Sequence, residues 1–200
     1  MTTRRHTPHP AIPEPMPVTH VLARHGRTVL NAQGRLRGRL DPPLDELGRA
    51  QAARLAELLV PLVAGWRHPI VSSPLARTIQ TAQAIAARTG LTVTIDERLI
   101  DRDYGQWAGH LRDEVLGRWG SLDAAPGVEA HAQLDARVRS ILDESVEWEP
   151  VVLVTHDAVL HVLLGHLDPR LTDTQIDPGS WSSLGRTATG ELVVTSTNQR

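Results

Sequence analysis

The chain has no cysteine and no lysine, and each absence excludes a class of chemistry. With 0 cysteines in 200 residues, disulfide frameworks, thiolate zinc sites, iron–sulfur clusters and cysteine-nucleophile phosphatases or proteases are excluded. All 21 basic residues are arginine, which excludes Schiff-base and pyridoxal chemistry as well as nucleotide binding of the Walker type. Thiolate and amine catalysis are therefore outside what this sequence can perform.

Long hydrophobic runs and a secretory signal are also missing. No apolar run reaches the roughly 18 residues that a transmembrane helix needs, and the N-terminus has no apolar segment of the signal type. Five prolines, at positions 8, 10, 13, 15 and 17, prevent a helix there and predict a disordered or extended leader over residues 1–17. The remaining residues, 18–200, are predicted to form a single domain. A cytoplasmic location without a membrane partner is expected.

The rest of the chain alternates between strand-like and helix-like segments. Short apolar segments at 18–23, 69–72, 91–95 and 150–155 predict strands, and two more are expected at 181–184 and 191–196. Helical spacing of apolar residues predicts helices over 44–63, 73–89, 128–147 and 158–167, with an irregular region at 96–125. Strands separated by helices of this length imply crossover connections and a mostly parallel sheet covered on both faces.

Two predicted strands end in the same kind of residue. The first runs into Arg24 and His25, and the strand near residue 151 runs into His156 and Asp157. Ligands bind at the carboxyl ends of strands in such sheets, so parallel neighbours would bring both histidines to one rim. Arg77, one helical turn after Ser72-Ser73, would join them. Imidazoles and guanidiniums together favour a phosphoryl group, which a neutral histidine can attack and carry covalently without a metal.

A series of short motifs runs from about residue 19 to 165 in a fixed order. They are RHGRT at 24–28 with Asn31, GRLRGRLDPPLDELGRAQA at 34–52, SSPLART at 72–78, YGQWAG at 104–109, PGVE at 126–129 and VTH at 154–156. In this order they resemble the signatures R-H-G-x-T-x-x-N, S-S-x-L-x-R, F-G-x-W-E-G and V-S-H of the histidine phosphatase superfamily, whose founders are the phosphoglycerate mutases. The resemblance implies a three-layer α/β/α sandwich with a mostly parallel central sheet, as in phosphoglycerate mutase.

The resemblance also implies a role for each matching residue. His25 would be the phosphorylated nucleophile, and Arg24, Arg77 and His156 would hold the phosphoryl oxygens. Asn31, Arg37 and Gly38 would contact the substrate. No metal and no cofactor are implied, and the partner would be a small phosphorylated molecule.

The proton donor is the point at which the sequence leaves two alternatives. The family's mutase-like branch has a glutamate before F-G-x-W, and the carboxylate at that place here is Asp101, one methylene shorter. The acid-phosphatase branch has His-Asp at the final motif, as His156-Asp157 does here. Asp101 is favoured because the surrounding motifs follow the mutase-like branch. Asp157 is expected either to bind substrate or to cap the next helix.

Three functions fit these residues. The favoured one is a metal-independent phosphomonoesterase acting on a small phosphorylated metabolite, because only about 180 residues follow the leader, as in the shorter phosphatases. The alternatives are a cofactor-dependent phosphoglycerate mutase and a non-catalytic scaffold that binds a phosphorylated ligand. The arginines of RLRGR at 35–39 are interpreted as the rim of a site for an anionic substrate. No nucleic-acid partner is expected, because this loop has no aromatic residues between its arginines. Oligomeric state is left open, with a homodimer as one alternative.

Overall fold

The computed structural model describes residues 16–200. The leader predicted over 1–17 therefore lies outside the described residues, apart from Met16 and Pro17. The strands are β1 Val18–Arg24, β2 Ile70–Ser72, β3 Val93–Ile95, β4 Val151–Thr155, β5 Trp181–Arg186 and β6 Leu192–Gln199. The α-helices are α1 Val29–Ala32, α2 Glu46–Leu62, α3 Ala76–Thr89, α4 Arg112–Trp119, α5 His131–Ser145 and α6 Asp157–Leu167. In this part of the chain no helix is long and apolar enough to cross a membrane.

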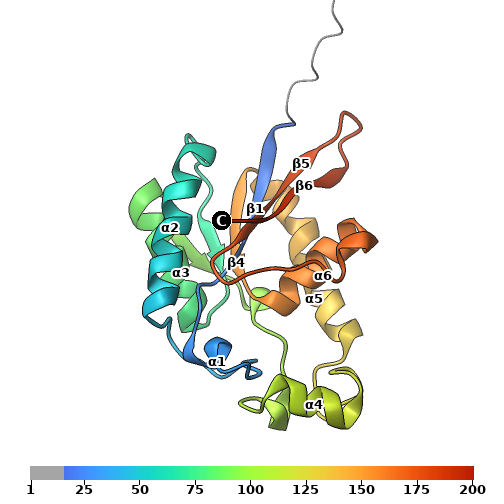
Figure 1. The fold of residues 1–200 in the computed structure, drawn as a ribbon. Coiled ribbons are helices and arrows are strands. Elements are labelled where there is room, and N and C mark those ends of the chain that lie inside the picture. Colours follow the sequence, from blue (N-terminus) through green and yellow to red (C-terminus); the bar gives the residue numbers. More distant parts are fainter. Residues whose placement is uncertain (1–15) are drawn as a thin grey trace, which may run out of the picture.

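The six strands form one sheet in the order β3-β2-β4-β1-β5-β6. The strands β3, β2, β4 and β1 are parallel to one another, whereas β5 and β6 are antiparallel to their neighbours. Helices α2 and α3 cover one face, and α5 and α6 cover the other (Figure 1). The predicted three-layer α/β/α sandwich with a mostly parallel sheet is confirmed.

Side chains alternate between the two faces because successive residues of a strand point in opposite directions. Val21 and Val152 pack with Leu55 of α2 in one core, whereas Leu22 and Leu153 pack with the α5–α6 layer in the other. Both faces of β4 and of the second half of β1 are thus buried, which explains why β4 reads as an almost continuous apolar run. These two strands form the rigid centre from which the polar residues at their ends project.

A third, smaller core stabilises the irregular region between β3 and α5. It contains Leu36, Tyr104, Trp107, Val115 and Ala125, all nearly buried. In Figure 1 helix α4 lies with α1 beyond the same end of the sheet, the end at which β1 finishes. The predicted irregular region at 96–125 therefore forms a separate rim beyond the ends of the strands.

Helix α3 begins later than the sequence pattern predicts. The expected start is at Ser73-Pro74, but the first helical residue is Ala76, and Leu75 before it has no side chain able to cap the helix. Instead the Asp41 carboxylate accepts a hydrogen bond from the Ala76 N–H at 2.7 Å. Because Asp41 comes from the loop before α2, this contact fixes that loop against the start of α3.

His20 is buried in β1 away from the strand ends, and it makes the stability of the fold sensitive to acid. Its Nε2 lies 2.9 Å from the Ser145 hydroxyl of α5. Burial lowers the pKa of His20 to about 4 from 6.5, against the attraction of Glu149. The folded protein therefore keeps this ring neutral at pH values where the unfolded chain would bind a proton.

Stability should consequently fall as the pH drops from about 6.5 towards 4. A shift of this size corresponds to about 3 kcal/mol lost from this group over that interval. Urea unfolding between pH 7.5 and 4.5 measures it for the wild type and for His20→Gln, which keeps hydrogen-bonding capacity but does not titrate. The variant should lose less stability across this range, and parallel curves for the two proteins would contradict the assignment.

Candidate active site

The ends of β1 and β4 bring two histidines together. Arg24 and Thr155 are register partners in this parallel pair, so His25 and His156 follow at the same edge of the sheet. The His25 N–H donates to the Thr155 carbonyl at 3.1 Å, and the two ring centroids are 5.2 Å apart. Both side chains are 0 % exposed. The convergence of these imidazoles, expected from the sequence, is present.

The backbone after His25 lies so close to the start of α2 that only glycine fits at two positions, Gly26 and Gly48. A Cβ at Gly26 would lie 2.3 Å from the Gly48 carbonyl oxygen, and one at Gly48 would lie 1.9 Å from the Arg27 carbonyl oxygen. The Gly26 N–H also donates to the Thr81 hydroxyl of α3 at 3.1 Å. Gly48 of α2 and Thr81 of α3 therefore fix the backbone just after His25.

The His25 ring is oriented by a single hydrogen bond. Nδ1 lies 2.7 Å from the Gly26 carbonyl oxygen, which can only accept, so Nδ1 carries the proton. Nε2 is buried and has no partner among the described residues. Burial, together with the cations of Arg77 and Arg24, holds the pKa of His25 well below its usual range. The ring is neutral, and its free lone pair is on Nε2.

His156 is held in the complementary way. Its Nε2 lies 2.7 Å from the Ser73 hydroxyl, which can donate to it and so leave the proton on Nδ1. Nδ1 is buried without a hydrogen-bond partner and lies 3.9 Å from an Asp101 carboxylate oxygen. Burial and the neighbouring Arg77 keep the pKa of His156 well below its usual value.

Arg77 lies in the first turn of α3 and is completely buried. Its terminal nitrogens donate to the carbonyls of Leu40 and Gly38, each at 2.8 Å, and to Asp101 at 3.1 Å. Gly38 adopts a positive φ of 51°, and a Cβ there would approach Arg102 and Tyr104 at 3.1 Å. The predicted substrate-binding glycine thus lets its loop approach closely enough to hold Arg77.

Arg24, the last residue of β1, is held from two elements. Its Nη1 donates to an Asp157 carboxylate oxygen at 2.9 Å and to the Ile176 carbonyl. Asp157 is the first residue of α6, and the N-cap position belongs to His156. The expectation that Asp157 caps this helix is therefore wrong, and its carboxylate pairs with Arg24 instead.

Five buried nitrogens at the site have no hydrogen-bond partner among residues 16–200. They are Nε of Arg24, Arg37 and Arg77, Nε2 of His25 and Nδ1 of His156. The three guanidinium nitrogens are donors, since a guanidinium cannot accept, and Nδ1 of His156 is a fourth donor in the tautomer in which Ser73 donates to Nε2. A buried donor without a hydrogen-bond partner costs free energy, so these donors are expected to bind an anion. A phosphoryl group fits, because its oxygens accept hydrogen bonds and its phosphorus can be attacked by the free nitrogen of His25.

The remaining predicted residues occupy different positions. Asp101 is 1 % exposed beside Arg77, and burial raises its pKa against the opposing effect of Arg37 and Arg77. Asn31 uses its amide oxygen to accept from the Thr28 N–H and hydroxyl, at 3.0 and 2.8 Å, in the capping box of α1. Only its amide nitrogen is left to contact a substrate.

Two groups at the site were not assigned from the sequence. One is the Ser73 hydroxyl, which contacts His156. Its position directly after β2 is the sequence feature that could have indicated this role. The other is the segment before β5, in which the Ile176 and Ser180 carbonyls accept from Arg24 and the Gly179 N–H donates to the His25 carbonyl. Backbone groups carry no side-chain signature, so no motif could have indicated them.

No grouping of three or more His, Cys, Asp or Glu side chains that could hold a metal ion is found within residues 16–200. The positive charge near the two histidines is supplied by Arg24, Arg37 and Arg77. These three guanidiniums come from three separate segments of the chain.

Removing one of these cations should slow the reaction strongly. Arg24→Ala and Arg77→Ala are each expected to lower kcat/KM for p-nitrophenyl phosphate by on the order of 10²–10³, the usual effect of one preorganised charge donor. Arg77→Ala should also lower the Tm, because Asp101 would lose its buried partner. The control is Arg54→Ala, since Arg54 is an exposed arginine of α2 that forms an ion pair with Glu57 one helical turn away. Changes below about threefold in both variants would argue against an anion site here.

Comparison with known proteins identifies the family. Residues 20–199 match the family model described as "Histidine phosphatase superfamily (branch 1)". The chain is 34 % identical over 187 residues to a glucosyl-3-phosphoglycerate phosphatase of Mycobacterium tuberculosis, covering 82 % of this chain and 79 % of that protein. It is 35 % identical over 158 residues to phosphoserine phosphatase 1 of Hydrogenobacter thermophilus, covering 72 % of each.

The solved structures agree with this result. A mycobacterial glucosyl-3-phosphoglycerate phosphatase in complex with VO3 superposes with a TM-score of 0.80 at 30 % identity, covering 92 % of this chain and 100 % of that one. The same kind of phosphatase with inorganic phosphate gives 0.76 at 29 % identity, covering 90 % and 97 %. The chain therefore belongs to branch 1 of the histidine phosphatase superfamily, and it is a phosphoric monoester hydrolase that acts on small phosphorylated molecules.

Proposed function

We propose that the chain hydrolyses its substrate without a metal, through a phosphohistidine on Nε2 of His25. The observation that carries this proposal is the hydrogen bond from Nδ1 to the Gly26 carbonyl, which leaves the Nε2 lone pair free in a buried site near Arg24, Arg37 and Arg77. A neutral imidazole fixed in this tautomer needs no general base to act as a nucleophile. Phosphoryl transfer then depends mainly on position and on stabilising charge.

In the first step, the Nε2 lone pair forms a bond to phosphorus while the bond from phosphorus to the ester oxygen breaks. The leaving oxygen takes a proton from a carboxylic acid. In the second step, water gives a proton to the resulting carboxylate and attacks phosphorus, and the bond from nitrogen to phosphorus breaks. The products are the alcohol, inorganic phosphate and the original neutral ring.

The phosphoryl oxygens would be held by Arg24, Arg37 and Arg77 and by the Nδ1–H of His156. Each of these groups has a buried nitrogen without a partner, and the groups come from three separate strand or helix ends and one loop. The amide nitrogen of Asn31 and the loop at Gly38 complete the binding site. Guanidinium groups suit this task since they pair with phosphate oxygens in a fixed, forked geometry.

Asp101 is the better candidate for the acid. Its carboxylate is buried 3.9 Å from His156 Nδ1, and burial raises its pKa, which favours the protonated form. Asp157 instead forms an ion pair with Arg24 at 2.9 Å and is about one-third exposed. We assign Asp157 to holding Arg24 in place at the edge of the substrate site.

The substrate we propose is a small phosphorylated metabolite related to those of the two named relatives. The mycobacterial relative is a glucosyl-3-phosphoglycerate phosphatase, and the Hydrogenobacter relative is a phosphoserine phosphatase. We treat residues 18–200 as the single catalytic domain. The lack of a nucleic-acid or membrane partner and a cytoplasmic location remain predictions from the sequence, and a homodimer remains one alternative for the assembly.

A panel of phosphate monoesters assayed with EDTA present tests both the reaction and its independence from metal. Phosphate release from p-nitrophenyl phosphate and from at least one metabolite is expected. The panel includes 3-phosphoglycerate with a bisphosphoglycerate primer, which reports mutase activity. Isomerisation without comparable hydrolysis would favour the mutase alternative, and loss of turnover in EDTA that added metal restores would overturn metal independence.

A further inference from the structure

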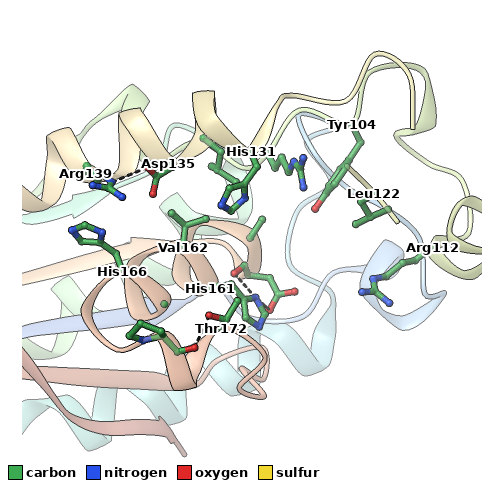
Figure 2. A pocket seen from close by; sticks show the side chains of 16 residues that line it. Tyr104, Arg112, Leu122, His131, Asp135, Arg139, His161, Val162, His166 and Thr172 are labelled. Carbon is green, nitrogen blue, oxygen red and sulfur yellow. Dashed lines mark hydrogen bonds and ion pairs between the residues drawn. The ribbon is translucent and has the colours of Figure 1, made fainter. Parts of the chain in front are cut away.

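His161 is a third histidine near the site, and it connects two elements that hold Arg24. It lies on α6, one helical turn after Asp157, and borders a cavity between α5 and α6 (Figure 2). Its Nδ1 is 3.0 Å from the Asp157 carbonyl oxygen, and its Nε2 is 2.9 Å from the Thr174 carbonyl oxygen. The ring therefore bridges α6 to the segment that follows this helix.

The two contacts of this ring depend on its protonation state. A carbonyl oxygen can only accept a hydrogen bond, and a neutral imidazole has a single N–H, so the neutral ring can make one of the two bonds. An imidazolium has two N–H groups and can make both. The Asp157 carboxylate lies 3.8 Å from Nδ1, so the charged ring also has a counterion. The bridge is thus complete only when His161 is positively charged.

The charged groups around this ring come from several elements. Within residues 16–200, Asp157 is the carboxylate within ion-pair distance of the His161 ring. Its Oδ1 also lies 2.9 Å from Arg24 Nη1, so one oxygen is placed between the two cations. In the segment after α6, Asp173 is exposed and Asp177 pairs with Arg200. The other titratable or charged residues that line the cavity are Arg102, Arg112, His131, Asp135, Arg139 and His166.

His161 contacts both supports of the Arg24 side chain. From α6, the Asp157 carboxylate accepts a hydrogen bond from Arg24 Nη1 at 2.9 Å. From the segment after α6, the Ile176 carbonyl accepts from the same nitrogen, and Ile176 lies two residues after Thr174. One ring nitrogen of His161 therefore contacts each of the two elements that fix the direction of the guanidinium.

We propose that His161, in its protonated form, is a positioning residue that holds the Arg24 guanidinium in place for phosphoryl binding. With both hydrogen bonds made, Asp157 and the backbone leading to Ile176 are tied to one ring. Loss of the proton breaks one of these bonds and leaves Arg24 less precisely held, which slows a reaction that depends on position. This inference rests on the proposed role of Arg24 in holding phosphoryl oxygens, and it adds a dependence of that role on pH.

Replacing His161 by leucine tests the proposal, because it removes both donors and the charge. His161→Leu should lower kcat/KM for p-nitrophenyl phosphate and weaken the binding of inorganic phosphate, each by about fivefold or more. The matched control is His166→Leu, which removes an exposed imidazole from the same helix and cavity and should change both quantities by less than about twofold. Thermal unfolding checks that both variants fold, and His161→Gln, which can keep the bond to Thr174 alone, allows the same comparison if the leucine variant does not.

Two readouts separate positioning of Arg24 from a general structural effect. In an Arg24→Ala background, His161→Leu should cause a further loss of less than about twofold, because the group that it positions is gone. The ratio of kcat/KM between the wild type and His161→Leu should be largest near about pH 6 and shrink towards about pH 8, as the imidazole loses its proton. Taking the ratio cancels the ionisation of the substrate, and p-nitrophenolate leaves without needing a proton.

The outcomes that would overturn the proposal are specific. They are equal activity and phosphate affinity in His161→Leu and His166→Leu, a loss of the same size with and without Arg24, or a ratio that does not change with pH. Failure of the wild type to release phosphate from any ester would contradict the proposed function instead. Calorimetry with inorganic phosphate, in the same variants and at the same pH values, would still decide the role of His161.

Discussion

Replacing His25 by alanine is expected to abolish phosphate release, with kcat falling by on the order of 10⁴ or more. The loss follows from the chemistry, because the hydrogen bond of Nδ1 to the Gly26 carbonyl makes Nε2 of His25 the unprotonated, unpartnered nitrogen of this ring. The fold should survive, since the ring makes a single hydrogen bond, to the neighbouring Gly26 carbonyl. Circular dichroism and thermal unfolding check the fold, and phosphate release from p-nitrophenyl phosphate measures the rate.

The intermediate itself provides the stronger readout. Wild-type protein mixed with labelled substrate and quenched at alkaline pH, where phosphohistidine survives, should carry label on the peptide that contains residue 25. His25→Ala should carry none, and His68→Ala, which changes a partly exposed histidine bonded to the Pro69 carbonyl, should be labelled as the wild type is. If the wild type neither acquires label nor hydrolyses any ester, the non-catalytic scaffold becomes the better description.

The central part of this site could be predicted from the sequence because parallel strands end together. The apolar run at 151–155 and residues 20–24 are buried on both faces, as is typical of neighbouring strands in a parallel sheet. Register places Arg24 beside Thr155, and therefore His25 beside His156. Arg77 follows from the same logic, since it lies in the first turn of the helix after β2. Its identification needed only the order of the elements and the residues at their ends.

The rest of the site depends on contacts that the sequence does not encode locally. The carbonyls of Leu40, Gly38 and Ile176 hold the arginines, and a carbonyl is common to every residue. The positions of Tyr104 and Trp107 depend on how the 96–125 region packs beyond the strand ends, in a core that is separate from the main ones. The Asp41 side chain replaces the missing cap of α3 from a different loop. Each of these features is a tertiary contact made by a segment without regular periodicity.

Asp101→Asn is the second change with a large expected effect, and the size of that effect should depend on the leaving group. A poor leaving group such as an alkoxide needs a proton as its bond to phosphorus breaks, whereas p-nitrophenolate leaves without one. Asp101→Asn should therefore lower kcat for an alkyl phosphate by on the order of 10²–10⁴ and leave p-nitrophenyl phosphate much less affected. Asp157→Asn weakens the hold on Arg24 instead, so it should slow both substrates to a similar degree.

The pH dependence separates the two carboxylates further. Burial raises the pKa of Asp101, and an acid works only while it is protonated, so kcat for alkyl phosphates should decline as the pH rises through that raised pKa. Asp101→Asn should lose this decline, since an amide does not titrate, whereas Asp157→Asn should keep it. The nucleophile imposes no opposite limit near neutrality, because the pKa of His25 lies well below its usual range and the ring stays unprotonated. If Asp157→Asn were to abolish the decline and to spare p-nitrophenyl phosphate, the proton would come from the first residue of α6, and Asp101 would serve to hold Arg77.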